Sequence, residues 1–302
     1  ERERERERES TMGIKYFWKY LRKTFHAEGV LESGRTRDGA KHFDNIYVDV
    51  NNLLYPLASP DMDDTTVFLR MFALLDKIFY QYRPHGVVML AMDGPAPLSK
   101  ILTQKSRRLE SVGAASQFDP DCMSSLQFCP GTQFMDRLKH ALLYYCCTHL
   151  AKAERFKSVS FIVSGADREG EGEMKMFQHL YQSEKKTKSL IISNDSDLAL
   201  FCLQAQVAEH DMGILQVLDS AGELMTYWNI GNLAKTLSKY SQVPLQQTVD
   251  DFIFMSLLSG NDYLPTMEGY RMIKTWEKYV KVRQTDKSPL VTFGDNGSSL
   301  QI

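Results

Sequence analysis

Short apolar runs that alternate with amphipathic stretches are the feature that most restricts the fold of this chain. The runs at 45–50, 86–92, 158–163, 189–193 and 214–218 are mostly apolar, and stretches of helical periodicity lie between them. Strands that are apolar on both faces are typical of a parallel sheet covered by helices on both sides. The sequence therefore predicts an α/β fold with a mostly parallel central sheet flanked by helices on both faces.

Composition divides the 302 residues into an arm, a body and a tail. Residues 1–11 are a low-complexity arm or an artefact, the body extends over 12–285, and 286–302 form a polar tail. No apolar run approaches the roughly eighteen residues of a membrane helix, so no membrane partner is expected. Five cysteines without a pairing framework indicate reduced thiols, and hence an intracellular, reducing compartment: the cytoplasm, the nucleus or an organelle matrix.

Carboxylates follow the predicted strands at the points where these strands end. Asp49 ends the first strand and Asp93 follows the second. Five further acids lie near the starts of predicted helices or after one: Glu171, Glu173, Asp195, Asp197 and Asp262. A single Asp in such a place is usual as a turn or helix cap. Because ligands of open α/β sheets bind beyond the carboxyl ends of the strands, we expect the seven acids to converge on one edge.

A crowded group of carboxylates stays ionised only if cations lie among its members. Oxygen ligands favour Mg²⁺ or Mn²⁺ over zinc, and the seven histidines show no zinc-binding spacing. Two such ions roughly 3.5–4 Å apart would hold the attacking and leaving oxygens of a phosphodiester. The sequence thus predicts a site for two Mg²⁺ or Mn²⁺ ions that hydrolyses phosphodiesters with a metal-activated water and no protein nucleophile.

A basic helix is predicted over 97–111, directly after Asp93. Four side chains fall within roughly one 100° sector of this helix: Lys100, Gln104, Arg107 and Arg108. Arg can bind a phosphate through two parallel hydrogen bonds, and Lys adds a point charge. This face can therefore form a pocket for a terminal phosphate beside the metals, and its ordinary alternative is a solvated basic surface.

Eight short motifs follow one another between residue 12 and about residue 290. They are Met12–Phe17, Tyr47–Asn51, Met92–Pro97, Lys100–Arg108, Pro130–Met135, Gly170–Lys175, Asn194–Leu198 and Ser259–Pro265. In this order they resemble the N-terminal nuclease region of the Xrn family of 5′→3′ exoribonucleases. A more distant resemblance connects the chain with flap endonucleases and PIN-like nucleases, which implies a flap-nuclease-like α/β fold.

The resemblance implies a role for each group of residues. The seven acids look like the catalytic, metal-binding set, and the four side chains of the basic helix look like the pocket that selects a 5′-monophosphate. Family members degrade single-stranded RNA processively from its 5′ end to mononucleotides. The segment from Gly13 resembles the part that lies at the exit side. Tyr55, and Phe17 or Trp18, are candidates for stacking on bases, with core packing as the alternative.

The chain departs from the family pattern in three places. Tyr55 stands where the family usually has a His, and Glu169 stands where a Pro is usual. The chain also ends near the point where a second conserved region of the family would begin. Either the sequence is a fragment, or a second protein supplies the missing region.

Three functions remain open on these grounds: an active exoribonuclease, a non-catalytic RNA-binding or scaffold subunit of a larger ribonucleoprotein, and a flap endonuclease. The presence of all seven acids and all four pocket residues favours the first. The net charge of −2 gives no globally basic surface. Without residues 1–10 and the seven acids, however, the remainder carries +6, which is compatible with a basic shell around an acidic site.

Overall fold

The computed structural model describes residues 14, 17–25, 28–34, 40–98, 100–101, 105, 123–183, 185–219, 221, 223–293 and 300–301. The chain forms two compact units. Unit 1 is drawn from residues 1–32, 195–214 and 228–302, and unit 2 from residues 33–194 and 215–227. No helix of the described residues is long and apolar enough to cross a bilayer.

Seven strands among the described residues form one sheet in the order β1-β7-β6-β5-β2-β3-β4. In chain order they are β1 (Leu31–Ser33), β2 (Lys41–Asp49), β3 (Tyr82–Ala91), β4 (Ser160–Ser164), β5 (Lys188–Ile192), β6 (Asp211–Val217) and β7 (Met225–Asn229). The pairings of β2 with β3, β2 with β5 and β3 with β4 are all parallel. The prediction of an α/β fold with a mostly parallel sheet is confirmed, whereas β1 and β7 were not predicted.

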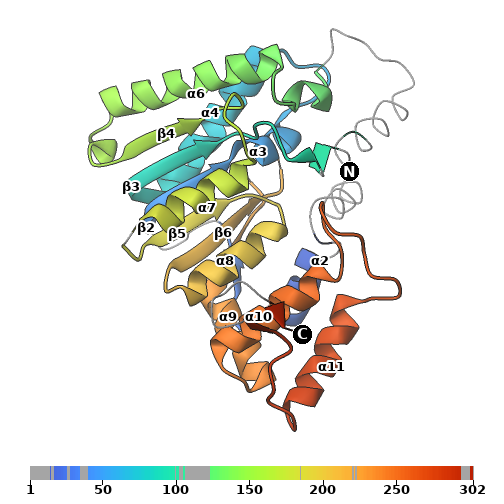
Figure 1. Cartoon of the computed structure of the whole chain (residues 1–302). Coiled ribbons are helices and arrows are strands. Elements are labelled where there is room, and N and C mark those ends of the chain that lie inside the picture. The colour runs from blue at the N-terminus through green and yellow to red at the C-terminus, as the bar shows by residue number, and fades with distance from the viewer. Residues whose placement is uncertain are drawn as a thin grey trace. The chain divides into compact units, whose positions relative to one another are not determined.

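The helices of unit 2 cover both faces of its strands. They are α3 (Val50–Leu57), α4 (Asp64–Gln81), α6 (Gln133–Lys152) and α7 (Gly172–Gln182), with 3₁₀ turns η1 (Ser125–Phe128) and η2 (Glu154–Phe156). Helices α4 and α6 lie on one side of the strands and α7 lies on the other (Figure 1). On the first side Ile46 and Val88 belong to a buried apolar core with Leu74 and Leu138. On the other side the Tyr47 hydroxyl lies 3.0 Å from Nδ1 of His179.

Helix α4 illustrates why these segments form helices. Its buried side chains recur every three or four residues, at Val67, Met71, Leu74, Leu75 and Ile78, so one stripe faces the core. The Asp63 side chain accepts a hydrogen bond from the Thr66 N–H at 2.9 Å and caps the amino end. The periodic apolar side chains and this N-cap therefore account for the helix.

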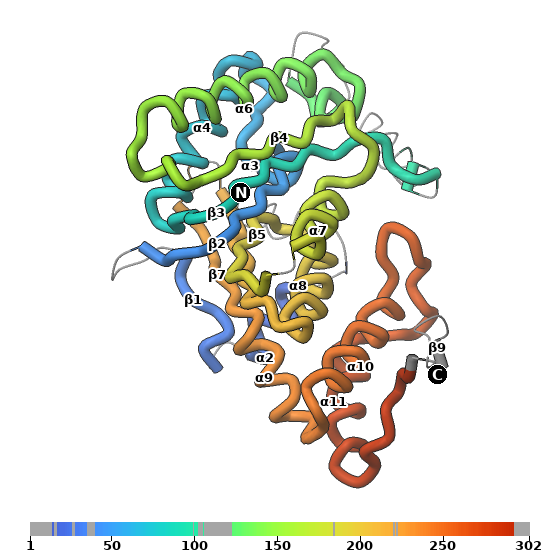
Figure 2. The backbone as a smooth tube through the Cα atoms, turned by 60° about the vertical axis from the view of Figure 1, so that its left-hand side comes forward, coloured from blue at the N-terminus to red at the C-terminus, as the bar shows by residue number. Residues whose placement is uncertain are grey.

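Unit 1 is mainly helical. Its helices are α2 (Phe17–Phe25), α8 (Asp197–Val207), α9 (Ile230–Ser241), α10 (Leu245–Leu257) and α11 (Met272–Arg283). Figure 2 shows α10 and α11 side by side, and these two helices are in contact. Two short strands, β8 (Thr292–Phe293) and β9 (Leu300–Gln301), pair in antiparallel fashion within the predicted polar tail.

Candidate active site

The parallel pairing of β2 with β3 brings Asp49 and Asp93 to the same edge of the sheet. Asp49 is the last residue of β2 and lies opposite Ala91, two residues before Asp93. On the other side of Asp93, Glu171 is the N-cap of α7 and Glu173 lies in its first turn. Four of the seven predicted metal-binding acids thus belong to unit 2, and these four lie at strand ends or at a helix start.

Asp93 is held by backbone and side-chain contacts from two other segments. Its N–H donates to Oδ1 of Asn51 at 3.0 Å, and its Oδ1 accepts from the Gly172 N–H at 2.8 Å. The loop after β3 lies close to the loop before α7, since a Cβ on Gly94 would come within 1.6 Å of the Arg168 carbonyl oxygen. Only glycine permits this approach, which brings Asp93 to the amino end of α7.

Burial raises the pKa of the Asp93 carboxyl above its ordinary value, and the negative charge of Glu171 acts in the same direction. The Gly172 N–H and the positive charges of Lys100 and Lys175 lower the pKa but do not cancel the effect of burial. A buried carboxyl of this kind gains from any further cation that lies beside it.

Lys100 places the start of the predicted phosphate pocket against this acidic group. Its Nζ lies 2.7 Å from Oε1 of Glu171, and the Glu171 side chain is only 3% exposed. Lys100 and Ile101 are helical, in agreement with the predicted basic helix. Gln104, Arg107 and Arg108 lie outside the described residues, so their roles stay predictions.

The carboxylate of Asp49 is held by hydrogen bonds from α3 and from the end of β5. Its Oδ1 accepts from the Asn52 N–H at 3.1 Å, and its Oδ2 accepts from the Ser193 hydroxyl at 2.9 Å. Asn194 is held in turn, because its N–H donates to Oδ1 of Asn52 at 2.9 Å and its side chain bonds both backbone groups of Val217. The end of β5 is therefore anchored beside the end of β2.

Three predicted acids belong to unit 1. Asp195 accepts a hydrogen bond from the Asp197 N–H at 3.0 Å, so both lie at the amino end of α8. Between them, the Ser196 hydroxyl accepts from the Ile14 N–H at 2.6 Å, which ties the first motif of the chain to this helix start. Asp262 lies in the loop after α10.

The donor chemistry of these acids fits Mg²⁺ or Mn²⁺. The predicted ligands are carboxylate oxygens, and two lysine ammonium groups already lie near the acids of unit 2, which shows that this group attracts cations. In the part of the chain that the structure describes, no three Asp, Glu, His or Cys side chains are grouped to hold a metal ion.

The aromatic candidates for base stacking differ in exposure. Tyr55 is 42% exposed and forms a T-shaped ring pair with Phe128, so part of this side chain is accessible. Phe17 and Trp18 are only 1% and 3% exposed. For these two candidates the alternative of core packing holds, because both rings pack against buried aromatic side chains of unit 1.

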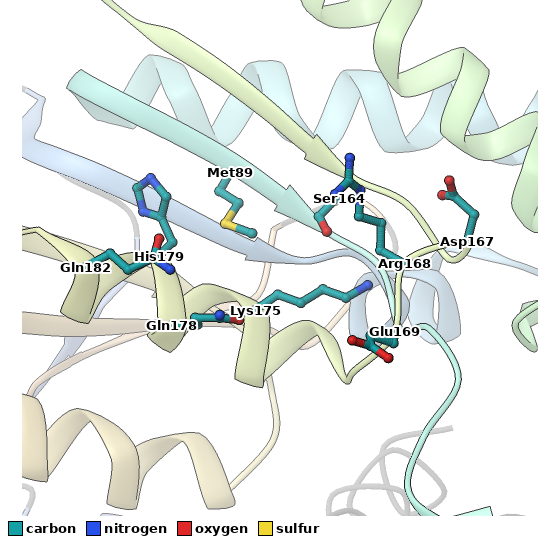
Figure 3. A pocket seen from close by; sticks show the side chains of 9 residues that line it. All are labelled: Met89, Ser164, Asp167, Arg168, Glu169, Lys175, Gln178, His179 and Gln182. Carbon is teal, nitrogen blue, oxygen red and sulfur yellow. The ribbon is translucent and has the colours of Figure 1, made fainter.

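Sequence analysis assigned no role to Lys175, which the structure places beside Asp93. Lys175 lies four residues after Glu171, the N-cap of α7, and this spacing was the available signal. Its stem also lines an open cavity of about 610 Å³, with Glu169 and His179 among the other lining residues. Figure 3 shows the Lys175 nitrogen at the end of the cavity where Arg168 and Glu169 lie.

Comparisons with known proteins identify the family of this chain. The family described as XRN 5′-3′ exonuclease N-terminus matches residues 12–216. The matched part of the chain is thus the N-terminal domain of an exonuclease family. The chain belongs to the XRN 5′-3′ exonuclease family.

Individual relatives are distant and longer. The 5′-3′ exoribonuclease 1 of Schizosaccharomyces pombe is 24% identical over 310 residues, which cover 85% of this chain and 22% of the relative. The human 5′-3′ exoribonuclease 1 is also 24% identical, over 84% of this chain and 17% of its own length. The chain therefore spans less than a quarter of the length of these two relatives.

Solved structures show a weaker similarity. The catalytic core of Rad2 in complex with a DNA substrate has a TM-score of 0.48 and 16% identity, covering 89% of this chain and 68% of that chain. Flap endonuclease-1 from Methanococcus jannaschii has a TM-score of 0.39 and 17% identity, covering 81% of this chain and 74% of that chain.

Proposed function

We propose that this chain is a Mg²⁺-dependent 5′→3′ exoribonuclease that degrades 5′-monophosphorylated, single-stranded RNA to mononucleotides. The observation that carries the proposal is the group formed by Asp93, Glu171 and Lys100 at the sheet edge of an XRN-family chain. It joins two predicted metal ligands to the first residue of the predicted phosphate pocket. Two Mg²⁺ or Mn²⁺ ions are the proposed cofactors.

The residues of the chain have distinct tasks in this proposal. Bound divalent ions supply Lewis acidity to the scissile phosphate and lower the pKa of an attacking water. Asp49, Asp93, Glu171 and Glu173 would hold these ions, and the sequence motifs assign Asp195, Asp197 and Asp262 to the same task. Asn51 and the Gly172 N–H orient Asp93. Because hydrolysis uses water as the nucleophile, no protein side chain forms a bond with the RNA.

Selection at the 5′ end is assigned to the basic helix. Lys100, Gln104, Arg107 and Arg108 bind the terminal monophosphate and exclude a cap or a triphosphate by size and charge. Tyr55 stacks on the first bases, which gives affinity without sequence specificity. We place the protein in a reducing intracellular compartment.

The proposal is tested with three RNAs of one sequence that carry a 5′-monophosphate, a 5′-hydroxyl or a 5′-triphosphate. We expect mononucleotide release in Mg²⁺ from the first RNA and much slower release from the others. Equal release from all three would contradict the pocket assignment. Binding of RNA without any release would instead support the non-catalytic scaffold, and internal cuts would support a flap-type endonuclease.

Replacing Arg107 by alanine is expected to lower kcat/KM for the 5′-monophosphorylated RNA about 10–100-fold, since one charge-assisted phosphate contact is lost. Release from the 5′-hydroxyl RNA should change little, because that substrate lacks the phosphate. The matched control is Arg155→Ala, an exposed arginine of η2. A uniform loss on both RNAs would show that Arg107 does not read the 5′ end.

A further inference from the structure

Lys175 is a buried lysine of α7 whose ammonium lies at the ends of strands β3 and β4. The residue is 9% exposed, and its Nζ donates to the Met92 carbonyl at 2.9 Å and to the Gly165 carbonyl at 3.1 Å. Both acceptors are backbone groups, and the negative charge of Asp93 also acts on this ammonium. The side chain therefore connects α7 with two segments of unit 2 that are far apart in the sequence.

The two carbonyls lie just beyond the point where β3 and β4 stop pairing. Strands β3 and β4 pair in parallel up to Ala91 and Ser164, and the Met92 N–H still donates to the Ser164 carbonyl at 2.9 Å. Beyond this point the segments that follow β3 and β4 no longer pair, and they lead to Asp93 and Gly165. The ammonium thus binds two carbonyls beyond the end of the ladder, of which the Gly165 carbonyl also accepts from the Arg168 N–H at 3.2 Å, and it joins the two strand ends where the ladder stops.

Burial of this ammonium carries a cost that a neutral side chain would avoid. A buried ammonium loses its hydration, and two carbonyl hydrogen bonds replace only part of it. A methionine has a similar length, fills the same space and needs no hydrogen-bond partner. A charged side chain at this place is therefore better explained by what its two hydrogen bonds position than by packing alone.

We propose that Lys175 is a positioning residue for Asp93. It binds the carbonyl of Met92, the residue directly before Asp93, and so fixes the backbone from which the carboxylate projects. Asn51 holds the Asp93 N–H and Gly172 holds its carboxylate. Together these contacts give the carboxylate one orientation toward a bound ion. The inference rests on the proposed function, because it assigns Asp93 to the metal-binding set.

The test is the variant Lys175→Met, with Lys157→Met as the matched control. Lys157 is a surface lysine of unit 2 whose side chain is 69% exposed and pairs with Glu154. We expect Lys175→Met to lower kcat about 10–100-fold with KM for RNA within about twofold, as for other residues that orient metal ligands. Unchanged kcat, or a change in KM alone, would overturn the proposal.

Hydrogen exchange gives a second readout that does not depend on activity. In Lys175→Met the Gly172 N–H, which donates to Asp93, should exchange faster by on the order of tenfold, while the amides of α4 keep their rates. If the methionine variant does not fold, Lys175→Leu, which also lacks a hydrogen-bond donor, replaces it under the same criteria. Unchanged exchange at Gly172 would also overturn the proposal.

These two readouts separate the inference from the proposed function. If the unmodified chain releases no nucleotide, the proposed function fails, whereas faster exchange at Gly172 in Lys175→Met still supports positioning. If the unmodified chain is active and Lys175→Met matches it in kcat and in exchange, only the inference about Lys175 fails.

Discussion

Asp93→Asn is expected to reduce mononucleotide release by at least ~100-fold, because a direct metal ligand matters more than the outer residues whose loss costs about 10–100-fold. The amide oxygen can still accept the Gly172 hydrogen bond, so the geometry of the loop is retained. Steady-state release from a 5′-monophosphorylated RNA measures this loss.

The same substitution should leave folding intact. Because burial raises the pKa of the Asp93 carboxyl, its negative charge costs stability in the folded protein, and a neutral amide removes that cost. The melting temperature should therefore stay equal or rise. Asp61→Asn, at an exposed loop position, is the control and should change neither quantity. Full activity of Asp93→Asn would mean that this carboxylate does not bind the catalytic ions.

Asp251→Ala is expected to destabilise unit 1 by ~3–5 kcal/mol, the usual cost of leaving one partner of a buried ion pair. Asp251 is fully buried, and its oxygens accept from the Tyr279 hydroxyl at 2.8 Å, the Leu290 N–H at 2.9 Å and the Arg283 guanidinium at 3.5 Å. The substitution would leave the buried guanidinium of Arg283 without its counter-charge. Urea unfolding, followed by the fluorescence of the three tryptophans, gives the free energy of unfolding.

Two further variants identify the cause of that loss. Asp250→Ala changes the neighbouring, partly exposed carboxylate, which interacts with Gln246, and should cost no more than ~1 kcal/mol. The double variant Asp251→Leu with Arg283→Met removes both charges and should recover much of the stability. If Asp251→Ala and Asp250→Ala unfold at the same urea concentration, the buried ion pair of Asp251 with Arg283 does not stabilise unit 1.

The apolar runs predicted the central strands because their signal is local. Residues 45–50, 86–92 and 189–193 are apolar enough to be recognised without knowledge of their partners, and they lie within or close to β2, β3 and β5. Strand β7 has the sequence Met225–Asn229, with Thr and Asn among its five residues, and gives no such signal. Helix α3 contains Pro56 and follows β2 without a break, so no boundary separated it from the strand in the sequence.

The candidate site divides in a similar way. Acids at strand ends can be recognised from the pattern alone, and Asp49 and Asp93 do lie at the same edge. The groups that orient Asp93 could not be predicted, because Asn51 and Gly172 are 42 and 79 residues away from it in the chain. In the sequence, Lys175 could be recognised only as the last residue of the motif Gly170–Lys175. Its role depends on two backbone carbonyls that only the fold brings together.

The most direct test of the central claim is mononucleotide release from 5′-monophosphorylated RNA before and after removal of divalent ions. The account predicts release in Mg²⁺, complete loss with EDTA, and recovery when Mg²⁺ is restored in excess. Release that continues at the same rate with EDTA would contradict it, as would a chain that binds this RNA in Mg²⁺ and leaves it intact.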